Sequence, residues 1–172
     1  MPVNPVIDRV SSAIQGRIDA AKAAGNDKLA QRWMRELGSL TDGPTTDVMT
    51  AIAFDPAAFE RLAIYAAQKV RRMLGAFVGT GHVDPYRMAL VKNAKHAGGS
   101  LSSSAMRATL DKSQPCTTAL KIRRAGADTT AATQVSSTVE ALEALGMAAV
   151  TKLGKERVIT VNFEHPLAKV FA

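Results

Sequence analysis

The sequence predicts a mainly α-helical protein with one small β-hairpin near its C-terminus. Apolar residues recur at helical spacing in several segments that precede Gly146. Asn or Asp followed by Pro, a pair that caps and begins a helix, occurs three times. After Gly146, β-branched runs flank a short turn that contains glycine, a pattern typical of a hairpin. The three helix-starting pairs are Asn4-Pro5, Asp55-Pro56 and Asp84-Pro85.

The composition is that of a folded protein. The chain has 172 residues, of which 47% are hydrophobic and 22% charged, enough for one ordinary domain or two small ones. The single Cys116 excludes an intrachain disulfide framework and a multi-cysteine zinc site. The N-terminus lacks the pattern of a signal peptide, and no apolar run approaches the ~18 residues of a membrane span. We therefore expect a cytoplasmic protein with no membrane partner.

The first forty residues predict an antiparallel helical hairpin. One helix begins at Pro5, the break at residues 24–26 includes Gly25, and a second helix ends before Gly38. Residues 40–46, which contain Asp-Gly-Pro, are expected to form a loop. The apolar stripe of the first helix comprises Ile7, Val10, Ile14, Ile18 and Ala21.

Asp55-Pro56 predicts the start of a long amphipathic helix over residues 56–77. Glycines near residue 80 end it, and we place a domain boundary at residues 79–83. Residues 1–80 then form a helical region that can support oligomerisation, and residues 84–172 form a second domain. The apolar face of the long helix comprises Phe59, Leu62, Ala66, Val70, Met73 and Phe77.

The second half predicts a helix over residues 85–97, a short helix over 102–110 and a third helix over 130–145. A further short helix is expected over residues 117–125. In the third helix, Val135, Val139, Leu142 and Leu145 form an apolar stripe. The opposite side, which we expect to be exposed, carries Thr133, Ser136, Ser137 and Glu140.

A helix, a Gly stop at Gly146 and a hairpin with basic residues around Leu153-Gly154-Lys155 follow one another here. This order resembles the recognition helix and wing of the winged helix-turn-helix DNA-binding proteins, strictly over the last quarter of the chain and loosely over its last half. The resemblance implies an N-terminal helical region followed by a C-terminal winged helix-turn-helix domain over residues 84–172, with the third helix in the major groove of DNA.

Two assignments of the three helices fit this resemblance. The first uses residues 85–97, 102–110 and 130–145, with a long insertion before the third helix. The second uses residues 102–110, 117–125 and 130–145, with the helix over 85–97 as a preceding support. We favour the second, because it keeps the connection before the recognition helix short.

Positive charge is concentrated in the same half of the chain. Residues 1–84 contain ten Lys and Arg against nine Asp and Glu, whereas residues 85–172 contain twelve against six. The net charge of +7 therefore arises almost entirely after residue 84. A polyanion is the simplest partner for such an asymmetry, and we expect double-stranded DNA.

The candidate DNA-binding residues fall into three groups. Polar residues of the third helix can read base edges, and basic residues of the hairpin can contact phosphates or the minor groove. A basic cluster upstream can clamp the backbone, and six phosphate contacts would give a log–log salt slope of roughly −5. The three groups are Thr133, Gln134, Ser136 and Ser137; Lys152, Lys155 and Arg157; and Lys121, Arg123 and Arg124.

The residue types that carry catalysis are scattered. His82, His96 and His165 lack metal-ligand spacing, and Cys116 has no obvious His partner nearby. No phosphate-binding loop motif occurs, and the carboxylates do not cluster as in a metal-dependent nuclease. We therefore expect a non-enzymatic protein without metal or cofactor.

The function that we predict is DNA binding in transcription control, or in replication, partition or packaging of a plasmid or phage genome. A homodimer or higher homo-oligomer would match repeated half-sites. The alternative is a protein-interaction adaptor built on a winged-helix scaffold, since fold does not settle function. An unrecognised small enzyme is the weakest of the three hypotheses.

Overall fold

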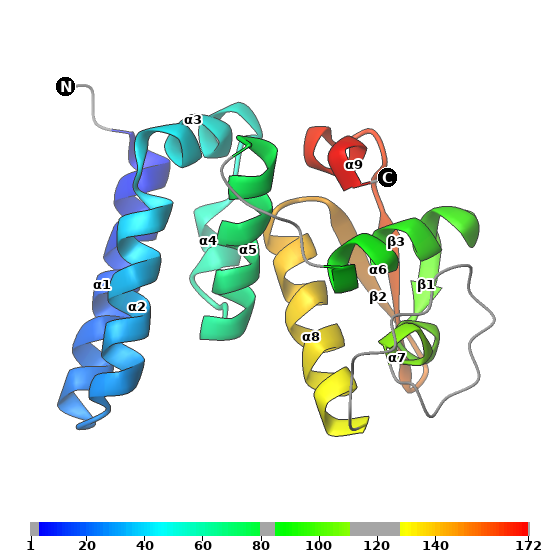
Figure 1. The fold of residues 1–172 in the computed structure, drawn as a ribbon, viewed down its shortest axis with the longest axis horizontal. Helices are drawn as coiled ribbons and strands as arrows, with labels where there is room; N and C mark the ends of the chain where they lie inside the picture. The colour runs from blue at the N-terminus through cyan, green and yellow to red at the C-terminus, as the bar shows by residue number, and fades with distance from the viewer. Residues whose placement is uncertain (1–3, 80–84, 111–127, 172) are drawn as a thin grey trace. The chain divides into compact units, whose positions relative to one another are not determined.

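A computed structural model describes residues 4–79, 85–110 and 128–171 (Figure 1). The described residues form helices and one small three-stranded antiparallel sheet that includes a C-terminal hairpin. This confirms the predicted fold class, mainly α with a β-hairpin. The chain divides into two compact units, Met1–Gly81 and His82–Ala172, and each is described by itself.

The described part of unit 1 consists of helices and the turns that join them. The helical hairpin expected at the N-terminus is present, and its two helices pack side by side along their length (Figure 1). Apolar side chains such as Val10, Ile14 and Trp33 are buried. The helices of unit 1 are α1 (Pro5–Ala23), α2 (Asp27–Leu40), α3 (Gly43–Ala51), α4 (Pro56–Phe59) and α5 (Ile64–Phe77).

Two of the predicted helix starts in unit 1 are confirmed by their capping bonds. The Asn4 side chain accepts a hydrogen bond from the Val6 backbone N–H at 3.1 Å. The Asp55 carboxylate accepts one from the Ala57 N–H at 2.9 Å. Each bond satisfies an N–H group that has no partner within the first turn of its helix.

The prediction of a loop over residues 40–46 is wrong. Helix α2 continues to Leu40, and α3 begins at Gly43. The Asp42 carboxylate accepts a hydrogen bond from the Thr45 N–H at 2.8 Å, so the Asp-Gly-Pro sequence caps a helix with Pro44 in its first turn.

The prediction of a single long helix over residues 56–77 is also wrong. This segment forms two helices, α4 and α5, and Ala63 between them has an extended ψ of 160°. The Glu60 carbonyl oxygen accepts a hydrogen bond from Arg17 of α1 at 2.6 Å. The Arg9 guanidinium, also on α1, pairs with the Glu60 carboxylate. These contacts with α1 hold the turn, although no Pro or Gly marks it in the sequence.

Unit 2 combines helices with the sheet. The sheet has the order β1-β3-β2, and both pairs of strands are antiparallel. The hairpin was predicted, whereas β1 and α9 were not. The elements are α6 (Pro85–His96), β1 (Ser100–Ser102), α7 (Ser103–Leu110), α8 (Asp128–Ala144), β2 (Ala148–Leu153), β3 (Glu156–Val161) and α9 (Pro166–Phe171).

The core of unit 2 lies between one face of the sheet and helices α6, α7 and α8. The predicted apolar stripe is confirmed, because its residues in α8 and Leu145, which follows the helix, are all at most 3% exposed. Leu101 of β1 and Ile159 of β3 are paired across the sheet and buried, and Met106 of α7 is buried as well. Helix α8 is therefore packed against β2 and α7.

The described part of unit 2 follows the element order of the first helix assignment. Strand β1 lies between α6 and α7, and α8 leads directly into β2 and β3. The short helix over residues 117–125, on which the favoured second assignment depends, lies outside the described residues.

Candidate nucleic-acid interface

The C-terminal end of α8 reverses the chain. Gly146 adopts φ +69°, and its N–H donates to the Glu143 carbonyl at 2.9 Å. The Met147 N–H donates to the Leu142 carbonyl, also at 2.9 Å. These bonds form a Schellman cap, for which glycine is the favoured residue. Strand β2 consequently runs back along α8, and the hairpin turn lies at the end of unit 2 where α8 begins (Figure 1).

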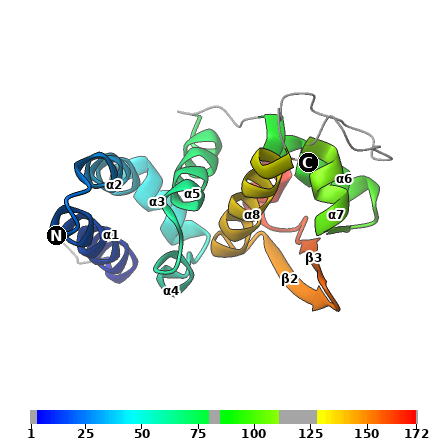
Figure 2. The same ribbon diagram turned by 90° about the horizontal axis from the view of Figure 1, so that it is seen from below.

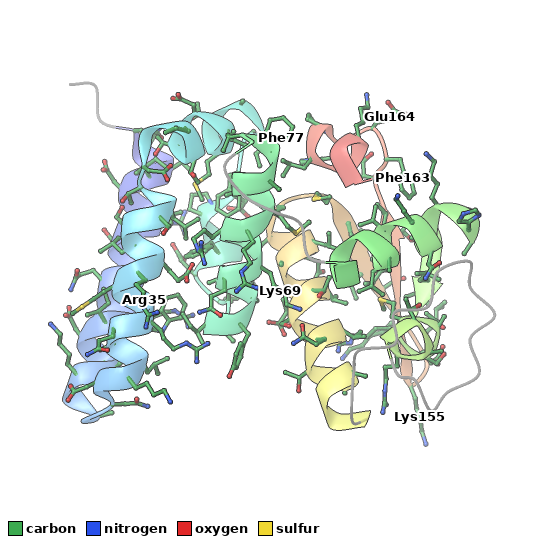
Figure 3. The ribbon with its side chains drawn as sticks, in the orientation of Figure 1. Arg35, Lys69, Phe77, Lys155, Phe163 and Glu164 are labelled. Carbon is green, nitrogen blue, oxygen red and sulfur yellow. The ribbon has the colours of Figure 1, made fainter. Side chains whose placement is uncertain are left out.

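The hairpin ends in a two-residue loop. Leu153 pairs with Glu156, and Gly154 and Lys155 join them. Gly154 has φ +62°, the pattern of a type II′ turn with glycine at its first position. Leu153 is 66% exposed and Lys155 is exposed (Figure 3). Figure 2 shows the hairpin projecting from the body of unit 2.

The register places two cations directly opposite each other. Lys152 pairs with Arg157, on the same face of the hairpin as the Val150–Ile159 pair. This face is buried at Ile159 and exposed at Lys152, so the two cations extend the core-facing side of the sheet beyond the core. Like charges at directly opposite positions repel each other. With Lys155 of the loop they form what we call the basic tip: Lys152, Lys155 and Arg157.

Arg157 connects the basic tip to two helices. Its guanidinium Nη2 donates to the Ser136 hydroxyl of α8 at 3.4 Å. Its backbone N–H donates to the Ser103 hydroxyl, at the start of α7, also at 3.4 Å. Both bonds are long and join a cation or amide to a neutral hydroxyl, so they are weak. A phosphate oxygen would be a stronger acceptor for the guanidinium.

Of the polar residues predicted to read bases from the third helix, Ser136 contacts the basic tip. Ser137 bonds within its own helix instead. Ser137 is 6% exposed, and its hydroxyl donates to the Thr133 carbonyl at 2.8 Å. The expectation that Ser137 lies on an exposed face is therefore wrong. Thr138 and Ala141 of α8 are also buried, so the buried surface of the helix is wider than its apolar stripe.

The other predicted contacts are distributed as follows. Thr133 is exposed and Gln134 is half-buried, both in the first half of α8. Lys121, Arg123 and Arg124 lie outside the described residues.

One basic residue of α7 was not among the predicted contacts. Arg107 is half-buried and lies one helical turn after Ser103 in α7. Ser103 accepts a hydrogen bond from the Arg157 N–H, and the sequence alone gave no indication of that contact.

In the described residues, no group of three or more His, Cys, Asp or Glu side chains could hold a metal ion. No helix of the same residues combines the length and hydropathy needed to cross a bilayer. Comparison of the chain with protein-family models, with curated proteins and with solved structures gives no match. The geometry of α8 and the basic tip therefore carries the functional argument.

Proposed function

We propose that the protein is a non-enzymatic, cytoplasmic protein that binds double-stranded DNA through unit 2. Helix α8 enters the major groove and the basic tip contacts the phosphate backbone beside it. The observation that carries the proposal is the Arg157–Ser136 contact, which joins the cationic hairpin to the polar side of α8. The protein acts in transcription control, or in replication, partition or packaging of a plasmid or phage genome, as a homo-oligomer.

The order of the elements supports this proposal. A helix, a strand, two further helices and a hairpin follow one another in the described part of unit 2, and β1 pairs with β3. The three helices and the hairpin follow the order of the first assignment to the winged helix-turn-helix pattern, and β1 was not part of that expectation. In such proteins the helix before the hairpin enters the major groove, and here that helix is α8.

The chemistry of the two elements is complementary to a duplex. Thr133 and Gln134 offer donors and acceptors near the start of α8, and Gln can make a bidentate contact with adenine. Lys152 and Arg157 repel each other across the hairpin, and a phosphate between or beside them would relieve that repulsion. The exposed Leu153 adds an apolar contact for a sugar or a groove wall.

The basic tip is tested by reversing its charge. We expect the double variant Lys155→Glu and Arg157→Glu to lose binding to a random duplex in a fluorescence-anisotropy titration at two salt concentrations. The matched control, Lys22→Glu with Lys28→Glu, makes the same charge change at exposed positions of unit 1 and should bind more tightly than the tip variant. Circular dichroism verifies that both variants remain folded. Equal affinities of the two variants would remove the tip from the mechanism.

A wild-type protein that fails to bind duplex even at low salt would overturn the proposal. The winged-helix scaffold would then be explained better as a protein-interaction adaptor.

Base reading by α8 is tested with a pair of variants on the same helix. Gln134→Ala should change the site obtained by selection from random duplexes, because a good bidentate contact discriminates by about 1–3 kcal/mol. Ser137→Ala should select the wild-type site, because Ser137 is buried and bonded within the helix. An unchanged site for Gln134→Ala would exclude this residue from base recognition.

A further inference from the structure

Four arginines gather around one cavity between α2 and α5 of unit 1. The cavity has a volume of about 300 Å³. We call this site the arginine pocket and define it by Arg32, Arg35, Arg71 and Arg72 with Glu36. Figure 3 shows nitrogen-bearing side chains, including the labelled Arg35, filling the region between the two helices.

Helical spacing places these residues on two facing stripes. Arg32, Arg35 and Glu36 lie at positions i, i+3 and i+4 of α2, and Ser39 continues the stripe. Gln68, Arg71 and Arg72 have the same spacing on α5. Because α2 packs against α5, the two polar stripes meet and line the cavity from both sides.

The charge of the pocket is not balanced. Glu36 is only 2% exposed, and its Oε2 accepts from the Arg71 Nε–H at 2.7 Å. This carboxylate can neutralise one of the four guanidinium groups, so the lining keeps an excess of three positive charges. Cations confined around one small cavity repel each other and create a strongly positive local potential.

Two of the four guanidinium groups, those of Arg32 and Arg71, are held in place by neighbours. Arg32 Nη2 donates to the Gln68 Oε1 at 3.3 Å, and the same guanidinium lies 4.7 Å from the centre of the Tyr65 ring. Arg71 is oriented by the buried Glu36. Arginines that are oriented before a ligand arrives lose little conformational entropy when they bind it.

We propose that the arginine pocket binds a phosphate group, held by Arg35, Arg72 and the outward donors of Arg32 and Arg71. Planar guanidinium groups bind phosphate oxygens bidentately, and phosphate supplies the negative charge that the pocket lacks. The volume lies at the lower end of the range for small-molecule sites. The phosphate can belong to a small phosphorylated molecule or to a nucleic acid, and this inference does not depend on DNA binding by unit 2.

The test uses the full chain and three probes: inorganic phosphate, AMP and a random DNA duplex. Calorimetry at low salt measures the first two, and anisotropy measures the third. The pocket variant Arg35→Gln with Arg72→Gln removes two charges and leaves both the Arg71–Glu36 pair and the Arg32–Gln68 bond intact. The control Lys28→Gln with Arg61→Gln removes two charges at exposed positions of unit 1 that do not line the cavity.

We expect the pocket variant to bind phosphate or AMP at least about tenfold more weakly than the control, since each lost charge-assisted hydrogen bond weakens binding by about that factor. If only the duplex binds, and only the pocket variant weakens it, the phosphate belongs to nucleic acid. Absence of binding by every probe, or equal affinities of the pocket variant and the control, would overturn the inference.

The tip variant Lys152→Gln with Lys155→Gln separates this result from the proposed function. It should keep wild-type affinity for phosphate and AMP. If the duplex fails to bind but AMP binds in the pocket, the proposed function fails and the pocket stands. Loss of AMP binding in the tip variant would place the phosphate site in unit 2 and contradict the inference.

Discussion

In unit 1 the clustered arginines surround a carboxylate that is almost completely buried, whereas in unit 2 the clustered cations stand on an exposed hairpin. Arg71 is held by Glu36 at 2.7 Å, with the carboxylate side chain 3% exposed. Arg157 contacts only a neutral hydroxyl with its described guanidinium bond, at 3.4 Å. The same residue type is thus paired with a buried carboxylate in one unit and weakly held at a surface in the other.

This difference predicts which property of the protein, its stability or its binding, substitutions in each cluster should change. A buried carboxylate needs its cation for folding, because an uncompensated charge in the interior is costly. Exposed cations contribute little to stability and remain available to a polyanion. Substitutions in the arginine pocket should therefore act on folding as well as binding, and those in the basic tip mainly on binding.

The largest effect is expected from Arg71→Ala. It removes the hydrogen-bonded partner of the buried Glu36 carboxylate and leaves only the other guanidinium groups of the pocket nearby, which should lower the free energy of unfolding by about 2–3 kcal/mol. Lys155→Ala in the basic tip should change it by less than about 0.5 kcal/mol. Urea denaturation measures both. Adding Glu36→Leu to Arg71→Ala should recover most of the loss, and no recovery would show that the buried carboxylate is not the cause.

A smaller effect is expected from Gly154→Ala in the hairpin loop. Gly154 has φ +62°, where an L-residue is strained, so stability should fall by about 1–2 kcal/mol. No atom lies within 4 Å of the added Cβ, so the effect is conformational rather than steric. The matched variant Gly38→Ala, in α2 of unit 1 and also in open space, should stabilise the protein by about 0.5–1 kcal/mol. Equal changes in thermal unfolding would contradict the assigned turn.

A change in the salt dependence of DNA binding is expected from Lys152→Gln with Lys155→Gln. Each lysine that contacts a phosphate contributes about one released counterion, so the log–log salt slope of duplex binding should become less steep by about 2. The free energy of unfolding should change by less than about 0.5 kcal/mol, because both side chains are exposed. A slope equal to that of the wild type would place the phosphate contacts elsewhere.

The smallest effect is expected at a helix cap that titrates. Asp55 caps α4 with a carboxylate, whereas the His165 Nδ1 accepts from the Leu167 N–H at the start of α9, at 3.3 Å. Burial lowers the pKa of His165 below its ordinary value of 6.5. The contribution of this cap to the free energy of unfolding is therefore complete above pH 6.5. It is lost as the pH falls through the pKa of His165 in the folded state, since protonation converts Nδ1 from an acceptor into a donor.

His165→Asp should remove this pH dependence while keeping a cap before Pro166, as Asp55 does before Pro56. Thermal unfolding between pH 7.5 and pH 5 measures it against the wild type. A wild-type curve that is flat over this interval would contradict the assignment.

Local signals predicted much of the fold. The caps at Asn4 and Asp55 and the stop at Gly146 depend on bonds within a few residues, so the sequence around each is sufficient to recognise it. The apolar stripe of α8 was recognised for the same reason, because one helix turn repeats every few residues.

The elements that were missed depend on distant partners. Strand β1 has three residues and exists by pairing with β3, from Ser100–Thr160 to Ser102–Val158. The turn between α4 and α5 is held by Arg17, which lies 43 residues from Glu60. The burial of Ser137 likewise follows from packing around α8 beyond its apolar stripe.

The helix caps at Asn4 and Asp55, the hairpin turn and the excess of positive charge after residue 84 could be read from the sequence, because these are properties of neighbouring residues or of simple counts. Which charges lie close together follows from how the helices pack. The first half of the chain is nearly neutral as a count, yet packing of α2 on α5 brings Arg32 and Arg35 to Arg71 and Arg72 around one buried carboxylate. Electrostatic interactions depend on distance in space, and that distance is set by how the helices pack.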